Sequence, residues 1–89
     1  MSAPRKQTAA ALRYDGSSDA PTLVASGKGH VAEKILAAAR EARIPIREDT
    51  LLAEALSALE VGTQVPEELY QAVAEALVWA YRLSGRRPE

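Results

Sequence analysis

The spacing of prolines and glycines restricts the possible folds of this chain more than any other feature. Pro45 disfavours helical geometry at Ile44 and lacks the N–H donor that a continuing helix needs, so a helix that starts near His30 must end by residue 43. Pro66 instead suits the first turn of a helix, where a missing N–H has no consequence. With Gly62 as the stop before it, these breaks predict helices near 30–42, 50–59 and 66–83.

The apolar residues inside these segments recur at the spacing of helices that bury one face. Asp49 or Thr50 can cap the second helix through a side-chain oxygen. The expected buried stripes are Val31, Ile35, Ala38, Ala39 and Ala42 in the first helix, Leu52, Ala55, Leu56 and Leu59 in the second, and Leu69, Val73, Ala76, Leu77 and Ala80 in the third.

Shorter segments favour extended structure. Residues 22–26 form a β-rich run that ends at Gly27, and residues 8–14 suit a buried strand although their alanines also favour helix. Pro45 confines a strand at 44–48 to its first residues or to a sheet edge, and the strand–helix–strand order favours parallel pairing of this strand with 22–26. The predicted fold class is α/β, with a small mixed sheet of about three strands (near 8–14, 22–26 and 44–48) packed with three or four helices. This single domain spans 8–83, between a frayed N-terminus at 1–7 and a flexible basic tail at 84–89.

Composition narrows the function classes. The chain has 89 residues, of which 47% are hydrophobic, and no cysteine, which excludes thiol catalysis, cysteine-ligated zinc and disulfides. Its net charge of −1 lacks the basic excess of a nucleic-acid binder, so we expect no nucleic-acid partner. No apolar run approaches the ~20 residues that cross a bilayer. We therefore expect a soluble protein of the cytoplasm with no direct membrane insertion.

Isolated polar residues give no pattern that indicates catalysis. His30 is the single histidine and no nucleophile is placed to pair with it, so we expect a surface or capping role. The sequence Gly27-Lys28-Gly29 lacks the full phosphate-loop pattern and suits a strand-to-helix turn. The paired acids at 48–49 and 67–68 are accounted for by helix capping and the helix dipole. We expect no enzyme activity, catalytic residue, cofactor or metal; a small hydrolase or isomerase would need a nucleophile–base pair or a metal cluster.

Five phrases of the sequence follow one another in a recognisable order. They are Ala11-Leu12-Arg13-Tyr14-Asp15, Ala20-Pro21-Thr22-Leu23-Val24-Ala25-Ser26-Gly27, Ile44-Pro45-Ile46-Arg47-Glu48-Asp49, Leu52-Ala53-Glu54-Ala55-Leu56, and the long segment from Val61 to Glu75. Together, over roughly residues 9–83, they resemble the C-terminal cytoplasmic domain of the FlhB/YscU family of the type III secretion export gate.

The sequence also departs from the family's pattern at one functional segment. Full-length members carry membrane helices ahead of this region and an Asn-Pro-Thr-His loop whose asparagine cyclises and cuts the chain. In register, that loop falls on Pro4-Arg5-Lys6-Gln7, and no asparagine occurs anywhere in the sequence, so this self-cleavage chemistry is excluded. We expect the chain to resemble the C-terminal fragment that remains after the cut. The strand that precedes the cut in the family is missing from this sequence. If that strand lies beside residues 9–14 in the family, we expect an unpaired sheet edge here, which a partner strand can fill.

The resemblance implies partners among export-apparatus proteins and export substrates, at the cytoplasmic side of the inner membrane. The function expected is a non-catalytic interaction module that substitutes for or competes with the processed fragment. The alternative is a regulatory decoy or adaptor of the same fold that acts outside secretion, and the oligomeric state stays open. The candidate partner contacts are Thr8, Leu12 and Tyr14 near the strand start, Val61 and Val65 in a turn, and the aromatic Trp79 on the last helix.

Overall fold

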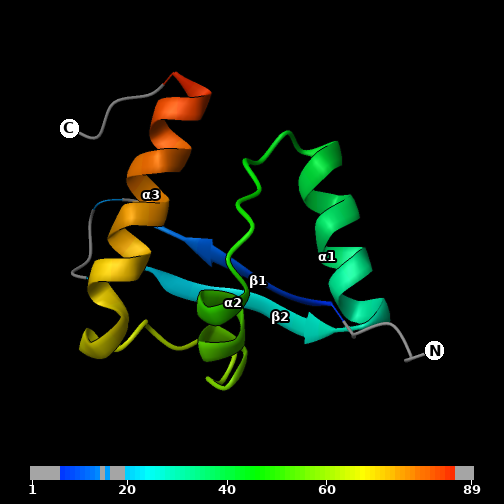
Figure 1. Ribbon diagram of the computed structural model, residues 1–89, viewed down its shortest axis with the longest axis horizontal. Helices are drawn as coiled ribbons and strands as arrows, with labels where there is room; N and C mark the ends of the chain where they lie inside the picture. Colours follow the sequence, from blue (N-terminus) through cyan, green and yellow to red (C-terminus); the bar gives the residue numbers. More distant parts are fainter. Residues whose placement is uncertain (1–6, 15, 17–19, 86–89) are drawn as a thin grey trace.

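A computed structural model describes residues 7–14, 16 and 20–85 (Figure 1). The predictions of a frayed N-terminus and a flexible tail fall mainly on residues outside this range. The observed elements are strands β1 (Thr8–Arg13) and β2 (Thr22–Lys28), helices α1 (His30–Glu41) and α2 (Thr50–Ser57), the short 3-10 helix η1 (Glu67–Leu69), and helix α3 (Tyr70–Ser84).

The two strands form an antiparallel sheet, in which Ala9 lies opposite Gly27 and Ala11 opposite Ala25. This confirms the mixed α/β fold and the strands predicted near 8–14 and 22–26. The predicted third strand at 44–48 and its parallel pairing are wrong: residues 44–49 are irregular and link α1 to α2. The chain turns at Arg43, whose φ is 58°, and the Ile44 N–H donates to the carbonyl of Ala39 at 2.8 Å. Ile44 therefore completes the end of α1 and takes no part in a sheet ladder.

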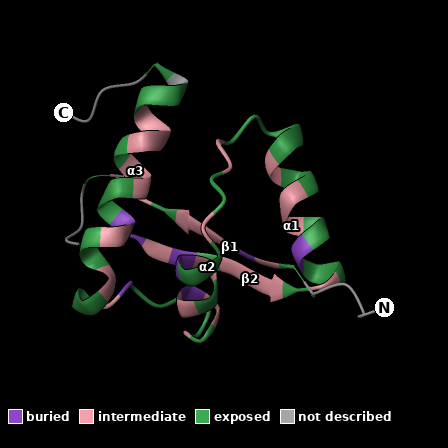
Figure 2. Cartoon of the chain, in the orientation of Figure 1, coloured by how far each residue is buried: buried purple, intermediate pink, exposed green. Residues whose placement is uncertain are grey.

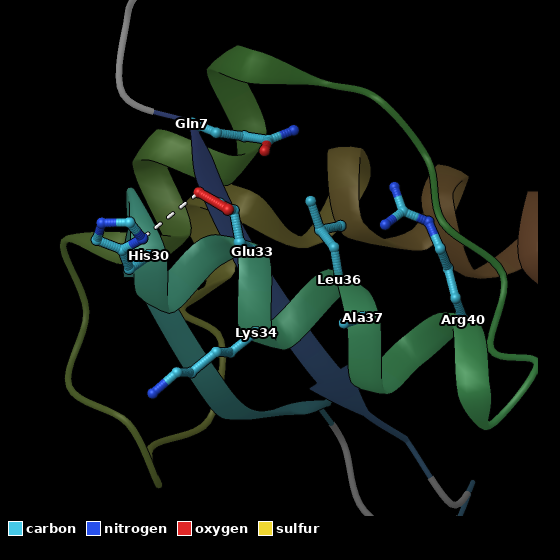
Figure 3. Close-up of a pocket in the computed structure, with 7 residues that line it drawn as sticks. All are labelled: Gln7, His30, Glu33, Lys34, Leu36, Ala37 and Arg40. Carbon is cyan, nitrogen blue, oxygen red and sulfur yellow. Dashed lines mark ion pairs between the residues drawn. The ribbon is translucent and has the colours of Figure 1, made fainter.

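The sheet separates α1 from the two other helices. The main core lies between the sheet and the α2–α3 side and is built on five buried side chains, Leu23, Leu52, Leu56, Val65 and Val73. Ala10, Leu12 and several residues of α3 pack against it. Helix α1 lies over the opposite face, as Figure 3 shows with α1 in front of the strands and the other helices behind. Successive side chains of a strand point to opposite faces, so Ala9 and Gly27 are on the α1 side.

Helix α1 is rotated relative to the predicted stripe. Ala32 is fully buried, whereas Val31 is 51% exposed. Gly27 explains the close approach of this helix, because a Cβ at position 27 would lie 2.6 Å from the Cβ of Val31. Small residues on both sides therefore bring α1 against the strands, and Figure 2 shows how much of this helix stays exposed.

The other two helices begin and end close to the predicted places. The Asp49 carboxylate accepts a hydrogen bond from the Leu52 N–H at 3.1 Å, so Asp49 is the cap of α2 as expected. Pro66 is extended, with ψ 159°, and precedes η1 rather than occupying the first turn of one long helix. Leu52, Leu56 and Val73 are buried as predicted.

Candidate protein-docking surface

The backbone of β1 alternates between groups that bond to β2 and groups that point away from it. The Gly29 N–H donates to the carbonyl of Gln7 at 2.8 Å, which makes this pair a hydrogen-bonded one. Opposite residues in an antiparallel ladder alternate between hydrogen-bonded and non-hydrogen-bonded pairs. In the observed register Ala9 therefore bonds to β2, while the N–H and C=O groups of Thr8 and Ala10 face outward.

The outward pattern continues past a β-bulge in β2 to the end of β1. The register shifts between Ala11 and Leu12, so that Leu12 lies opposite Leu23 and Val24 is the extra residue. Leu23 directs its own backbone away from β1: its N–H donates to Thr63 at 3.0 Å, and its carbonyl accepts from Gly62 at 2.7 Å. Leu12 consequently faces outward too. We call the outward backbone groups of Thr8, Ala10 and Leu12 the β1 edge.

The outer edge of β2 differs because the chain itself covers part of it. Thr22 pairs with Gln64, and the Val65 N–H donates to the Pro21 carbonyl at 2.9 Å. The rest of that edge ends at the exposed Lys28, and lysine on an edge strand discourages pairing. Among the described residues, by contrast, no backbone hydrogen bond joins the β1 edge to any other segment. The segment 44–49 passes on the β1 side of the sheet without such a bond (Figure 1).

The structure brings together half of the predicted contact residues. Thr8 and Leu12 belong to the β1 edge, and the half-buried Tyr14 follows the end of that strand. Val61 is exposed in the turn after α2. Val65 is only 2% exposed and belongs to the core, so its side chain is not available to a partner in this conformation.

Trp79 lies apart from the β1 edge, half-buried on α3. It lines a shallow depression between α3 and the segment before α2, together with Arg47, Gln71, Ala74, Glu75, Val78 and Arg82. The place of Arg47 beside α3 could not be predicted from the sequence. The sequence shows that Arg47 follows Pro45 closely, but not how far it lies from α3. The remaining members recur at spacings of three and four on α3, a helical periodicity distinct from that of the predicted buried stripe.

A second depression lies along α1 and holds His30 (Figure 3). The His30 Nδ1 is 3.6 Å from a Glu33 carboxylate oxygen, and the histidine side chain is 97% exposed. This solvated pair lies on the outer side of α1. Among the residues that the structure describes, no three histidines or carboxylates gather as a metal would require.

Within the described ranges, no helix combines the length and apolar character that crossing a bilayer requires.

Comparison with known proteins agrees with the arrangement of these elements. Residues 5–80 match the family described as the FlhB HrpN YscU SpaS Family. The chain is 47% identical over 76 residues to YlqH of Bacillus subtilis, covering 84% of this chain and 82% of that protein. It is 42% identical over 86 residues to the flagellar biosynthetic protein FlhB of Salmonella typhimurium, covering 88% of this chain but only 22% of FlhB.

Solved structures show the same fold. The cytoplasmic domain of FlhB from Shewanella putrefaciens superposes with a TM-score of 0.79 at 34% identity, covering 91% of this chain and 71% of that one. The C-terminal domain of PscU superposes with a TM-score of 0.75 at 31% identity, covering 81% of this chain and 94% of that one. The chain therefore belongs to the FlhB HrpN YscU SpaS family and has the fold of its C-terminal cytoplasmic domain.

Proposed function

We propose that this protein is a non-catalytic interaction module of the flagellar or type III export apparatus that binds a partner strand along the β1 edge. The observation that carries the proposal is the row of outward backbone groups at Thr8, Ala10 and Leu12, which have no backbone partner among the described residues. Its family membership and its likeness to flagellar FlhB support a place beside the export apparatus, on the cytoplasmic side of the membrane.

Strand addition suits this edge for physical reasons. Main-chain hydrogen bonds from an added strand supply affinity that is independent of side chains, and alternate side chains supply specificity. The two faces of β1 differ, since Ala10 and Leu12 contact the main core while Ala9 lies on the α1 side. An added strand would extend both faces, with one row of its side chains near α2 and the other near α1. A two-stranded sheet is also marginal by itself and gains from a third strand.

The finer proposal is that the protein substitutes for, or competes with, the matching domain of a full-length relative. Its support is the 42% identity over 86 residues to FlhB of Salmonella typhimurium. The matched region is 22% of the length of that relative. The chain has no asparagine and so cannot perform asparagine cyclisation. The protein would then act by binding alone. The strand that it binds along the β1 edge would be the segment that precedes the cleavage loop in the full-length relative.

A binding titration tests the docking mode. The purified chain is titrated with a peptide of the cognate FlhB segment that precedes the cleavage loop, and binding is followed by calorimetry. Thr8→Pro removes one outward N–H at the first residue of the strand, where proline is tolerated. Thr8→Val keeps that N–H and is the matched control. We expect Thr8→Pro to weaken binding about fivefold, the effect of one hydrogen bond of ordinary strength, and Thr8→Val to bind like the parent.

If the two variants bind the peptide with equal affinity and have unchanged thermal stability, the peptide binds at another surface. If the parent gives no heat of binding, the strand-addition proposal is rejected.

A motility assay separates the two finer roles. In a strain whose FlhB is truncated at the cleavage loop, a substituting protein restores swimming. In a strain with intact FlhB, a competing protein reduces swimming when it is overproduced, and no effect in either strain contradicts both roles.

A further inference from the structure

The outward face of α3 carries a charge pattern that complements itself. Gln71, Glu75, Val78 and Arg82 follow one another at helical spacings of four, three and four, so they form a seam on one side of the helix. The core-facing residue Val73 and its half-buried neighbours Ala76 and Leu77 lie on the other side. Helix α3 therefore has a second stripe that the fold itself does not use.

Among the residues that the structure describes, the charges of this seam have no ion-pair partner. Glu75 and Arg82 are both exposed and seven residues apart, about 10 Å along a helix, which is too far for a direct ion pair. In the described part of the chain, neither residue forms an ion pair, and neither does Arg47 across the depression. Val78 is exposed between them, and the half-buried Trp79 lies next to it in the same depression.

We propose that this seam, together with the adjacent Trp79, binds a second copy of the chain through antiparallel pairing of two α3 helices. A two-fold axis between Val78 and Trp79 would place Glu75 of each copy opposite Arg82 of the other. Such an interface is isologous and closes at a dimer. The two reciprocal ion pairs flank a small apolar centre in which Val78 meets the partner's Trp79.

The pattern favours a second copy over an unrelated acidic or basic partner. A ligand of one charge would meet attractive and repulsive residues together, because the depression holds Glu75 beside Arg82 and Arg47. A second copy in the antiparallel direction pairs Glu75 with Arg82 twice. The contact is short, so the dimer is weak and forms at high protein concentration, as interfaces below ~1,200 Å² do. The β1 edge plays no part in it, so this inference is independent of the proposed function.

Sedimentation equilibrium of the full chain at concentrations up to about 0.5 mM tests the dimer, a range chosen because small interfaces are weak. Glu75→Arg and Arg82→Glu each turn two attractive contacts into two repulsive ones, and we expect each to weaken self-association about tenfold. An equimolar mixture of the two variants restores the charge pairing and should associate like the parent. The double variant Glu75→Arg/Arg82→Glu also restores the pairing within each dimer and should recover self-association.

Several outcomes overturn the inference. A monomeric parent at the highest concentration does so directly. Self-association that both single variants retain places the contact on another surface, and its loss in Thr8→Pro would identify the β1 edge as that surface. If thermal unfolding shows the variants folded, but neither the equimolar mixture nor the double variant recovers self-association, then the reciprocal Glu75–Arg82 pairing is not what holds the dimer together.

Discussion

The two faces of the sheet are held by different kinds of contact. On the α2–α3 side, Leu23, Leu56 and Val73 interdigitate in a continuous aliphatic core. On the α1 side, Ala32 is the buried residue of the helix, and the neighbouring Val31 occupies the space that Gly27 leaves open. Large side chains stabilise by the area they remove from water, whereas small ones permit close approach but bury little. The α2–α3 side is therefore expected to provide most of the stability.

The comparison also bears on docking. Strand β1 is shared by both sides, since Ala10 and Leu12 face the main core and Ala9 faces α1. Its outer edge lies where the weakly packed α1 side meets the strongly packed one. The main core holds β1 from one face of the sheet. The following substitutions test this division of roles.

Leu23→Ala should have the largest effect. Leu23 is fully buried at the centre of the main core, and its truncation leaves a cavity that costs about 3 kcal/mol in the free energy of unfolding. Urea titration followed by circular dichroism measures this loss. The matched control is the neighbouring Val24→Ala, because Val24 is 41% exposed and should change the free energy by less than about 0.5 kcal/mol. Similar losses for the two variants would contradict the assignment of the core to one face.

Gly27→Ala should have the next largest effect, through overpacking on the α1 side. The new Cβ would collide with the Val31 side chain, so we expect a loss of about 1–3 kcal/mol. The second variant, Gly27→Ala/Val31→Ala, removes the colliding Val31 Cγ1 but keeps the Val31 Cβ, which would lie 2.6 Å from the new Cβ, so it should recover only part of that loss in a double-mutant cycle. A cycle with no coupling between the two positions would show that α1 does not pack where the structure places it.

Asp49→Ala should have a smaller effect, confined to the start of α2. The lost cap hydrogen bond to the Leu52 N–H corresponds to about 1 kcal/mol. Asp49→Ser keeps an oxygen that can accept the same bond and should remain within a few tenths of a kcal/mol of the parent. If the two variants unfold at the same urea concentration, the cap contributes nothing to stability.

Much of the fold could be predicted from the sequence because its signals are local. The Asp49 cap and the stripe of Leu52 and Leu56 identify α2 without knowledge of the rest of the chain. The orientation of α1 could not be predicted in this way. Its alanines are spread around the helix, so the periodicity of the sequence does not single out the face that carries the buried Ala32.

The error at residues 44–48 has a related origin. The sequence Ile44-Pro45-Ile46 has strand character, but strand pairing depends on distant partners, and the Ile44 N–H is already bonded to the end of α1. The burial of Val65 could not be predicted for the same reason. Val65 lies in a turn, and it is held in the core by the hydrogen bond between its N–H and the distant Pro21 carbonyl. Of the docking surface, the position near β1 was predictable, whereas the register against β2, which decides that Thr8, Ala10 and Leu12 face outward, was not.

The most direct test of the open β1 edge is amide hydrogen exchange by NMR, residue by residue along the strand. In the parent protein alone, the amides of Ala9 and Ala11 should exchange slowly because they bond to β2, and those of Thr8, Ala10 and Leu12 should exchange fast. Addition of the partner peptide should slow the second set and leave the first unchanged. Uniform protection along β1 without the peptide, or no change on its addition, would contradict an edge that is open for docking.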